Sequence, residues 1–466
     1  MPVIVIVADG ARPDSLASAM KRGIVPAFSR LRDEGGMHTL TSVFPSVTGP
    51  AYAPFLMGRF PGPVGLPGLR WYDRGRKTSR GPGHSRSYVG FEMRRIDGDI
   101  DPAAPTIFDL VPSSIAALNV INRGLSMENR IGYGLPFVAR TTKTHFTGNL
   151  GGWLEIDKYI GGQVADQIRR KRPEFVFAAM MGIDKTSHSE GHSGAYVDHA
   201  LAIIDDAVAE IRDDAEKRGQ WQNTHLWIVS DHGHSPVAQH DDLAGFVGRM
   251  GFRTIAHPFV YTPGAEAAVM VSGNAMAHVY LDLSRRERPY LPSMPDRWQA
   301  LKEALLSRES IDIMIVPVSR GACDVYGPGR GHARIDWSNS RISYRPVTGD
   351  PLGLGAVDNL SEDETYELTN STDYPDSLVQ ISRISDSPRS GEIILSAARD
   401  WDLRSKYEPI PHYSSHGALH RDHMLVPFIM NTAAASRPRR TVDVMPSALT
   451  ALGVSVPRGL DGRSFL

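Results

Sequence analysis

The chain of 466 residues contains a single cysteine, Cys323, which excludes an intrachain disulfide framework and a cysteine-rich zinc site. Its 51 Lys and Arg almost balance its 52 Asp and Glu, for a formal net charge of −1. The chain therefore has no excess of positive charge that would favour binding to nucleic acid or to an anionic membrane. Every apolar run is far shorter than the ~20 residues of a membrane-spanning helix, and the N-terminus lacks a basic leader region. We expect a cytoplasmic protein, and the sequence leaves its oligomeric state open.

Hydrophobic residues make up 41% of the chain and charged residues 22%, as in globular proteins with a large core. Apolar runs with strand character recur, and most are continuous rather than alternating, which is typical of parallel strands buried on both faces. Amphipathic helices are predicted over Tyr196–Arg218 and Arg297–Leu306. The pattern predicts an α/β three-layer sandwich, with a mostly parallel central sheet flanked by helices. The predicted strands are Val3–Ala8, Phe175–Met181, Leu226–Ser230, Ala267–Val271, His278–Leu283, Met314–Val318, Glu392–Ser396 and Met424–Met430.

Composition divides the chain further. Residues 1–234 and 391–466 are predicted to form the core, and the chain is expected to rejoin the main sheet from Glu392 to Met430. Between them, Gly, Pro, Ser and Asp clusters interrupt shorter segments, so 235–390 is predicted to be an inserted cap. A second loop-rich insertion, Phe60–Asp101, is dense in Gly, Pro and Arg. These two insertions would shape the substrate site.

Polar residues follow three of the predicted strands. Asp9 comes directly after the first, Asp184 after the second, and Asp231-His232 after the third. One such Asp is more often a turn residue or a helix cap. Three together favour a site at the carboxyl edge of the sheet, where α/β proteins gather functional groups. Carboxylate and imidazole ligands suit divalent metals such as zinc.

Further histidines accompany these carboxylates. His188 lies four residues after Asp184, so the two share a face if the segment is helical. His416 precedes Gly417, which permits a close backbone approach. His192 and His234 also lie near these positions and could replace a ligand or contact substrate. We expect both to lie behind the ligands or at the surface.

Thr48 precedes Gly49-Pro50 and a predicted helix, Ala51–Met57. Thr is a common helix cap, and Pro is favourable near a helix start. The same geometry would place the hydroxyl where a helix N-terminus favours an anion. A hydroxyl next to a metal site is also a nucleophile that the metal can activate. Capping and catalysis are compatible roles here.

Taken in order, the segments around these residues resemble the alkaline phosphatase superfamily, and most closely its type I nucleotide pyrophosphatase/phosphodiesterase branch. The resemblance covers most of the core, including the C-terminal tail, but little of the two insertions. The segments are Asp9-Gly10-Ala11-Arg12-Pro13-Asp14, Ser46-Val47-Thr48-Gly49-Pro50, Asp184-x-x-x-His188-x-x-Gly191, Ser230-Asp231-His232-Gly233 and Ser415-His416-Gly417.

The resemblance implies a metal-dependent hydrolase that cleaves phosphodiester or pyrophosphate bonds in a small phosphate ester or nucleotide-like substrate. It implies two divalent ions, Zn²⁺ or alternatively Mn²⁺. One ion would be held by Asp184, His188 and His416, and the other by Asp9, Asp231, His232 and Thr48. Thr48 would attack phosphorus in line and form a phosphothreonine intermediate, which water then hydrolyses. Electrostatic stabilisation of the phosphoryl charge would supply most of the catalysis.

The sequence departs from that branch at Leu69. The family usually carries an asparagine there, within Gly-Asn-x-x-Tyr-Asp, and its amide binds a phosphate oxygen; this chain reads Gly68-Leu69-Arg70-Trp71-Tyr72-Asp73. A leucine side chain donates no hydrogen bond. Arg70 is a candidate replacement because guanidinium suits phosphate, although an exposed loop arginine is an equally good interpretation. Arg70 and Tyr72 are our predicted substrate-binding residues.

The departure keeps other activities open, namely a phosphomonoesterase or a phosphonate-ester or phosphonate hydrolase on the same core. A sulfatase is disfavoured because position 48 is threonine and Cys323 lies outside a Cys-x-Pro-x-Arg context. A phosphoglycerate mutase of this superfamily would use serine and a different N-terminal motif. An alternative of another class is a non-catalytic protein that binds a phosphate ligand, which retention of the nucleophile and all the ligands argues against.

Overall fold

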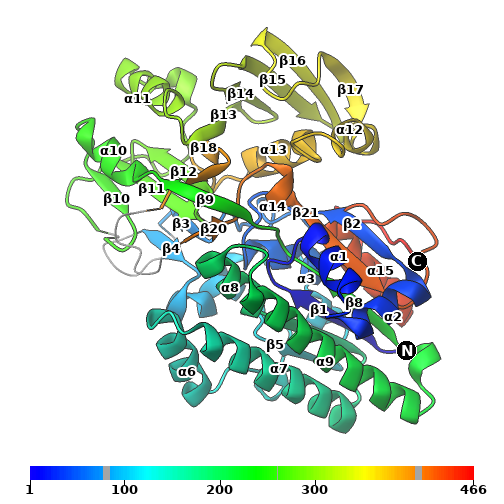
Figure 1. Ribbon diagram of the computed structural model, residues 1–466. Helices are drawn as coiled ribbons and strands as arrows, with labels where there is room; N and C mark the ends of the chain where they lie inside the picture. The colour runs from blue at the N-terminus through cyan, green and yellow to red at the C-terminus, as the bar shows by residue number, and fades with distance from the viewer. Residues whose placement is uncertain (77–83, 260, 405–411) are drawn as a thin grey trace.

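A computed structural model describes residues 1–76, 84–259, 261–404 and 412–466, and its strands form two large sheets (Figure 1). The first sheet has seven strands in the order β2-β21-β8-β1-β7-β5-β6. The five from β8 to β6 run parallel, whereas β21 is antiparallel to both β8 and β2. This confirms the predicted mostly parallel sheet. Its strands are β1 (Val3–Ala8), β2 (Met37–Thr41), β5 (Ser114–Ala117), β6 (Arg130–Ile131), β7 (Phe175–Met180), β8 (His225–Val229) and β21 (Leu425–Met430).

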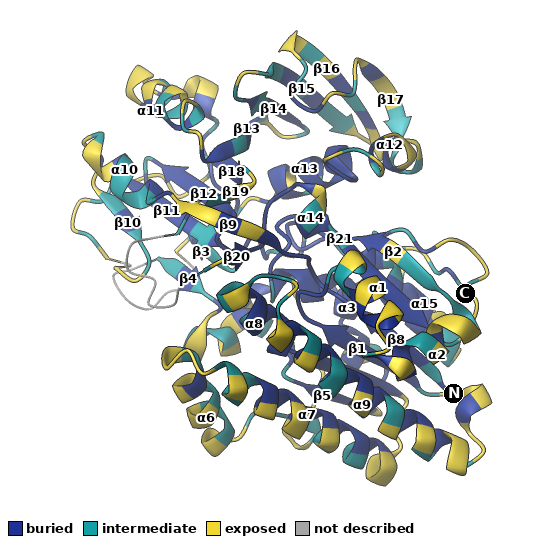
Figure 2. Cartoon of the chain, viewed as in Figure 1, coloured by how far each residue is buried: buried dark blue, intermediate teal, exposed yellow. Residues whose placement is uncertain are grey.

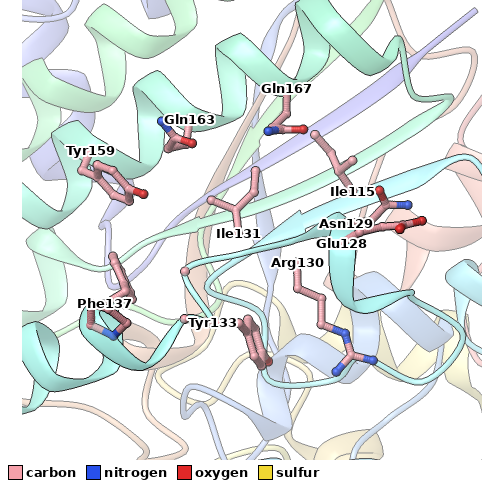
Figure 3. Close-up of a pocket in the computed structure, with 13 residues that line it drawn as sticks. Ile115, Glu128, Asn129, Arg130, Ile131, Tyr133, Phe137, Tyr159, Gln163 and Gln167 are labelled. Carbon is pink, nitrogen blue, oxygen red and sulfur yellow. The ribbon is translucent and has the colours of Figure 1, made fainter.

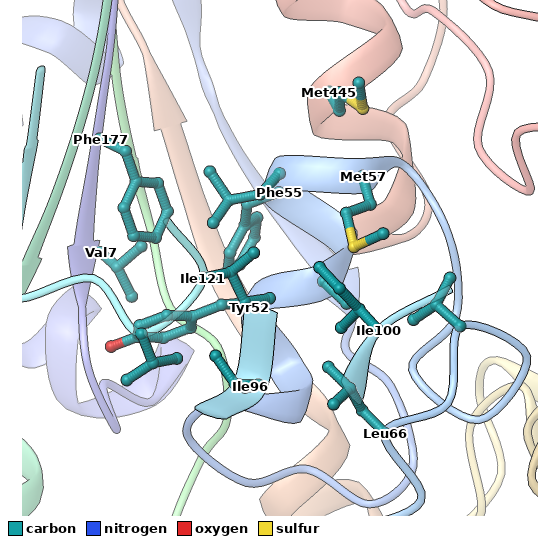
Figure 4. Close-up of a cluster of buried hydrophobic side chains, with 14 of the residues drawn as sticks. Val7, Tyr52, Phe55, Met57, Leu66, Ile96, Ile100, Ile121, Phe177 and Met445 are labelled. Carbon is teal, nitrogen blue, oxygen red and sulfur yellow. The ribbon is translucent and has the colours of Figure 1, made fainter. Parts of the chain in front are cut away.

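Helices cover both faces of this sheet, because successive side chains of a strand point to opposite faces. Ile4 and Ile6 of β1 belong to the core beneath α1 (Pro13–Lys21), α2 (Pro26–Gly35), α7 (Leu150–Lys171) and α9 (Ala195–Lys217). Val5 and Val7 belong to the opposite core, with α3 (Ala53–Met57) and α15 (Val444–Leu452). Figure 4 shows part of this second core, in which Phe55 of α3 lies near Phe177 of β7. The three-layer sandwich is therefore confirmed.

Burial follows the same layering. The central strands β1 and β7 are buried along their whole length, and the outward faces of α7 and α9 are exposed (Figure 2). Helix α9 matches the predicted Tyr196–Arg218 to within one residue at each end, because its apolar positions repeat at the helical period. None of the helices in the described ranges is both long and apolar enough to cross a membrane.

The second sheet has nine strands in the order β10-β11-β12-β18-β13-β14-β15-β16-β17. Its neighbours are antiparallel except β10 and β11. Helices α10 (Leu243–Arg249), α11 (Asp296–Leu306), α12 (Glu362–Thr369) and α13 (Ser377–Asp386) accompany it. Its strands are β10 (Thr254–Ala256), β11 (Ala267–Ser272), β12 (Met276–Leu281), β13 (Ile311–Ser319), β14 (Ala322–Gly327), β15 (Gly331–Ser338), β16 (Arg341–Gly349), β17 (Val357–Ser361) and β18 (Ile393–Ala397).

This sheet corrects one expectation. The segment from Glu392 was expected to rejoin the main sheet, but β18 lies between β12 and β13 in the second sheet, and only β21 returns to the first. All five residues of β18 are buried, as in a central strand of either sheet, so its apolar run could not indicate which sheet it joins. The limits 235–390 for an inserted cap remain a prediction.

A small three-stranded sheet lies beside the nine-stranded sheet. Through it the chain returns to the first sheet. It consists of β9 (Ser235–His240), β19 (Asp400–Asp402) and β20 (Ser414–Ser415). Strand β9 starts four residues after Asp231, and β20 ends directly before His416. Pairing of Ser415 with Ser235 therefore brings two sequence-distant histidine segments together.

Candidate metal centre

Three adjacent strands of the first sheet deliver carboxylates to one edge. Strand β1 pairs in parallel with β7 on one side and β8 on the other. Asp9 follows β1 directly, and Asp231 lies two residues beyond the end of β8. Helix α8 (Gly182–Glu190) starts two residues beyond the end of β7 and carries Asp184 and His188 one turn apart. The carboxyl edge of the sheet therefore holds the side chains that the sequence pattern predicted there.

The first cluster surrounds one oxygen of Asp184. Its Oδ1 atom lies 3.2 Å from Nε2 of His188, 3.0 Å from Nε2 of His234 and 3.5 Å from Nε2 of His416. Asp184 and His234 are almost completely buried, and His416 is 5% exposed. His234 was expected behind the ligands or at the surface. It instead lies within the cluster and reaches the same oxygen atom as the two predicted histidines.

The second cluster consists of Asp9, Asp231 and His232, all fully buried. Nε2 of His232 lies 3.4 Å from Oδ1 of Asp9 and 3.5 Å from Oδ2 of Asp231. Tyr52 donates a hydrogen bond of 2.9 Å to Oδ2 of Asp9, and the Gly10 N–H donates one of 3.3 Å to Oδ1 of Asp231. His232 also lies within ligand distance of the first cluster, so the two clusters are contiguous.

Thr48 joins the second cluster. Its Oγ1 lies 3.2 Å from Nε2 of His232 and 3.3 Å from Oδ2 of Asp9. The predicted helix Ala51–Met57 is wrong in its first residues, because a 3₁₀ turn covers Pro50–Tyr52 and α3 starts only at Ala53. The cap residue of α3 is Tyr52, and its side chain makes no capping bond. Thr48 is therefore not a helix cap; its hydroxyl faces the acidic cluster.

The electrostatics of the two clusters suit the binding of a cation. Burial, and then the neighbouring charges of Asp231 and Asp184, raise the pKa of Asp9 well above its usual range. Burial also raises the pKa of Asp231, and its Oδ2 is buried without a hydrogen-bond partner. Burial opposes ionisation of Asp184 too, but Lys185 and His188 outweigh it and hold the pKa of that carboxyl well below its usual range. Nζ of Lys185 lies 2.7 Å from Oδ2 of Asp184.

Burial favours the neutral form of two of the histidines. Burial, and then the nearby charge of His232, keep the pKa of His416 well below its usual range, and burial lowers the pKa of His234 to about 3. Neutral imidazoles beside buried carboxylates, one with an unpartnered oxygen, are what a divalent cation requires of its ligands. This cluster therefore fits a divalent metal site.

The predicted substrate-binding residues lie elsewhere. Tyr72 is 4% exposed, and its ring packs against those of Tyr280 and His84 at 5.8 and 6.3 Å. Arg70 is half-buried at the start of β3 (Arg70–Tyr72) and lines a narrow recess with Asp242 and Leu403. The structure does not bring either side chain into the metal clusters, and their role in substrate binding remains a prediction.

Leu69 lies close to the residue that follows Thr48. A Cβ atom placed on Gly49 would be 3.9 Å from Cδ1 of Leu69 and 3.9 Å from Cγ2 of Val120. The backbone next to Thr48 is therefore flanked by two aliphatic side chains. The departure noted in the sequence, a leucine in place of an amide donor, thus lies next to Gly49, the residue that follows Thr48.

Sequence reasoning named His234 without placing it among the ligands, and it missed two further contributors. His234 has a detectable signal, because an alternating His-x-His on an extended segment presents both rings to one side. Lys185 has a weaker signal, because it is a charged residue adjacent in sequence to a proposed ligand. His412, whose ring stacks on His188 at 4.5 Å, carries no signal in the sequence because its position depends on how the chain approaches β20.

A cavity of the described residues lies elsewhere in the fold. It has a volume of about 350 Å³ and lies between β6, α6 (Leu135–Phe146) and α7 (Figure 3). Phe137 and Tyr159 stand at one end, and Gln163 and Gln167 extend over it from α7. No residue of either metal cluster lines it, so the metal clusters, and not this cavity, carry the candidate chemistry.

Comparison with known proteins agrees with this assignment. The family model for type I phosphodiesterase / nucleotide pyrophosphatase matches residues 3–423. Phosphonoacetate hydrolase from Sinorhizobium meliloti 1021, in complex with phosphonoacetate, aligns with a TM-score of 0.58 at 16% identity, over 97% of this chain and 96% of that chain. Human ectonucleotide pyrophosphatase / phosphodiesterase 5 aligns with a TM-score of 0.59 at 13% identity, over 99% of this chain and 97% of that chain. No curated protein sequence gives a significant match.

Proposed function

Because the chain belongs to the type I phosphodiesterase / nucleotide pyrophosphatase family, within the alkaline phosphatase superfamily, we propose that it cleaves phosphodiester or pyrophosphate bonds through a phosphothreonine on Thr48. Members of this family are phosphoric ester hydrolases, and the chain is such an enzyme. The observation that supports the proposal most directly is the position of the Thr48 hydroxyl, 3.2 to 3.4 Å from His232 and Asp9. The substrate would be a small phosphate ester or a nucleotide-like molecule.

Two groups of residues would hold the two ions of this proposal. Asp184, His188 and His416 would hold one, and Asp9, Asp231, His232 and the Thr48 oxygen the other. Zn²⁺ suits these nitrogen and oxygen donors, with Mn²⁺ as the alternative. When bound, the ions supply Lewis acidity and positive charge at the reacting phosphoryl group.

The residues of the chain perform the remaining steps. The Thr48 oxygen attacks phosphorus in line, the bond to the leaving oxygen breaks, and the ester group departs. The Thr48 hydrogen has an acceptor in the Asp9 carboxylate, toward which the hydroxyl is directed. Tyr52 holds that carboxylate in place with its own hydroxyl. Water then cleaves the Thr48–phosphorus bond, releases the phosphoryl product and restores the hydroxyl.

Leu69 supports a second candidate on the same core. An aliphatic side chain beside Thr48 offers no amide for a non-bridging phosphate oxygen, which favours a monoester, or a phosphonate or its ester, over a nucleotide diester. Arg70 and Tyr72 remain our candidates for substrate binding. A cytoplasmic location also remains a prediction.

Substrate turnover tests the proposal. The protein would be stripped with a chelator, reloaded with Zn²⁺ or Mn²⁺, and assayed with bis-p-nitrophenyl phosphate, p-nitrophenyl phosphate and a p-nitrophenyl phenylphosphonate ester. We expect activity that disappears with the metal and returns with it. A clear preference for the diester supports the first candidate, and a preference for the monoester or phosphonate supports the second. Tight ligand binding without any turnover by the loaded protein would instead identify a non-catalytic binding protein.

A further inference from the structure

The tautomers of the three histidines around Asp184 are fixed by their Nδ1 partners. Nδ1 of His188 lies 2.8 Å from the carbonyl oxygen of Ser414, and Nδ1 of His416 lies 3.0 Å from that of Ser46. A carbonyl oxygen only accepts, so each Nδ1 must carry the hydrogen. A histidine that binds a metal is neutral and carries one hydrogen, so in that state the Nε2 atoms of His188 and His416 present a lone pair toward Asp184.

His234 is fixed in the same way by a hydroxyl. Its Nδ1 lies 3.1 Å from Oγ of Ser414, and that hydroxyl donates its hydrogen to the carbonyl oxygen of Ser235 at 2.9 Å. Because the Ser414 oxygen has no second hydrogen to give, it accepts from Nδ1 of His234. Nε2 of His234 is therefore also without a hydrogen, although it lies 3.0 Å from Oδ1 of Asp184.

Three nitrogen lone pairs thus converge on one carboxylate oxygen, an arrangement that repels unless a cation lies among them. The distances of 3.0 to 3.5 Å from these Nε2 atoms to Oδ1 of Asp184 also match the spacing of atoms that bind one metal ion. Ligands 2.0–2.1 Å from a tetrahedral zinc ion lie roughly 3.3 Å from one another. We propose that His234 is a fourth protein ligand of the ion held by Asp184, His188 and His416.

Two glycines allow the backbone to place His234 close to Asp184. Gly10 has a φ of +79°, and a Cβ there would come within 2.9 Å of Nε2 of His234 and 3.1 Å of Cα of Asp184. A Cβ on Gly233 would meet the carbonyl oxygen of Asp422 at 2.1 Å. Glycine at both positions lets the His232–His234 segment pass close enough for the His234 ring to reach Asp184.

The consequence is that the two ions would differ in how tightly they are bound. With His234, each ion would have four protein donors, but one donor of the Asp9 ion is the Thr48 hydroxyl that the proposed reaction uses, whereas all four donors at Asp184 stay in place. The ion at Asp184 would be bound more tightly and exchange more slowly than the ion at Asp9, whose set includes the neutral Thr48 hydroxyl. This inference rests on the proposed function only in its assumption of an ion at Asp184.

A zinc-loaded crystal structure with anomalous scattering at the zinc edge tests the ligand directly. We expect Nε2 of His234 at about 2.0–2.1 Å from the ion at Asp184. A separation above about 3 Å, with the ion bound by the other three side chains, would overturn the proposal. Because this measurement needs no substrate, it stands whether or not the protein hydrolyses phosphate esters.

Zinc affinity of the variants gives an independent measure. We expect His234→Gln to weaken the tighter zinc site by more than about 100-fold in competition with a chromogenic chelator, beyond the 10–100-fold typical of residues that only orient ligands. His192→Gln is the matched control, since His192 is a neighbouring histidine outside both clusters. Circular dichroism of the metal-free proteins separates misfolding from ligand loss. Equal zinc affinity of wild type and a folded His234→Gln would contradict the proposal.

Discussion

The imidazole rings of His232 and His416 stack face to face, with centroids 3.7 Å apart and planes within 4° of parallel. One ring belongs to the segment after β8 and the other to the segment after β20, so the stack joins the two ligand clusters. The Nδ1 atoms of both rings are directed at backbone carbonyl oxygens, 3.1 and 3.0 Å away. The two clusters are therefore in direct contact, and backbone carbonyl oxygens orient both rings.

Thr48→Ala should reduce turnover of the preferred substrate by about 10³-fold or more, because the nucleophilic oxygen is lost. Thr48→Ser keeps a hydroxyl and should retain measurable activity. Thr142→Ala, at an exposed position on α6, serves as the control for a threonine-to-alanine change. The measurement is kcat with saturating zinc. Normal activity of Thr48→Ala would exclude the phosphothreonine intermediate.

Leu69→Asn should raise kcat/KM for bis-p-nitrophenyl phosphate by about tenfold or more, since a hydrogen bond to a charged oxygen contributes about 1.5–3 kcal/mol. The reason is its position beside Gly49, where an amide could donate to the phosphoryl group. Leu69→Met, of similar size and without a donor, should leave the ratio of diester to monoester activity unchanged. An unchanged ratio in Leu69→Asn would mean that the side chain does not face the phosphoryl group.

Gly10→Ala should weaken zinc binding by about tenfold or more, because the added methyl group would displace His234 or Asp184. Gly23→Ala is a close control. Gly23 has a similar φ of +75°, but nothing lies within 4 Å of its added Cβ. Both variants should lose about 1–2 kcal/mol of folding stability from the left-handed backbone. Only Gly10→Ala should lose zinc affinity, and equal zinc affinity in the two variants would contradict the close packing described around Gly10.

Asp157 should make the metal-free protein less stable as pH rises. Burial raises the pKa of Asp157 to about 7, against the effect of the Gly182 and Met181 N–H groups that it accepts. Between about pH 4 and 7 the native state therefore holds a proton that the unfolded state has lost, and the free energy of unfolding falls as pH rises. The slope from this group would be of order 1 kcal/mol per pH unit.

Urea unfolding of the metal-free wild type and Asp157→Asn at several pH values measures this slope. Asp9 and Asp231 have raised pKa values as well and contribute in the same direction in both proteins, so the difference between the two slopes isolates Asp157. We expect the shallower slope in Asp157→Asn. Identical slopes would mean that Asp157 is not protonated in the folded protein near neutral pH.

Much of the fold could be predicted because buried parallel strands leave a strong apolar signal. Strand β1 was predicted at its observed limits, and the carboxylates at the ends of β1, β7 and β8 followed from it. The sheet to which β18 belongs could not be predicted, since strand pairing is decided by distant partners. In the same way, Thr48 and His416 lie in irregular segments, and only the resemblance to a known family identified them.

His234 shows a different limit. Its neighbours in sequence marked it as near the site, but its distance from Asp184 depends on Gly10 and on the Ser414 hydroxyl, which lie more than 170 residues away in the chain. Local sequence therefore identifies which residue types are available for a site. Packing between distant segments decides whether such a residue becomes a metal ligand.

The ligand positions extend from residue 9 to residue 416, and this has a consequence for how the enzyme matures. During synthesis, the strand that ends at Asp9 emerges long before His416, which lies 407 residues later in the chain. A nascent or truncated chain would lack a ligand of the Asp184 ion, and full metal loading would have to follow completion of the polypeptide. Metal affinity would then report on chain integrity, because loss of the residues from His416 onward would remove one ligand from a site whose other ligands were made long before.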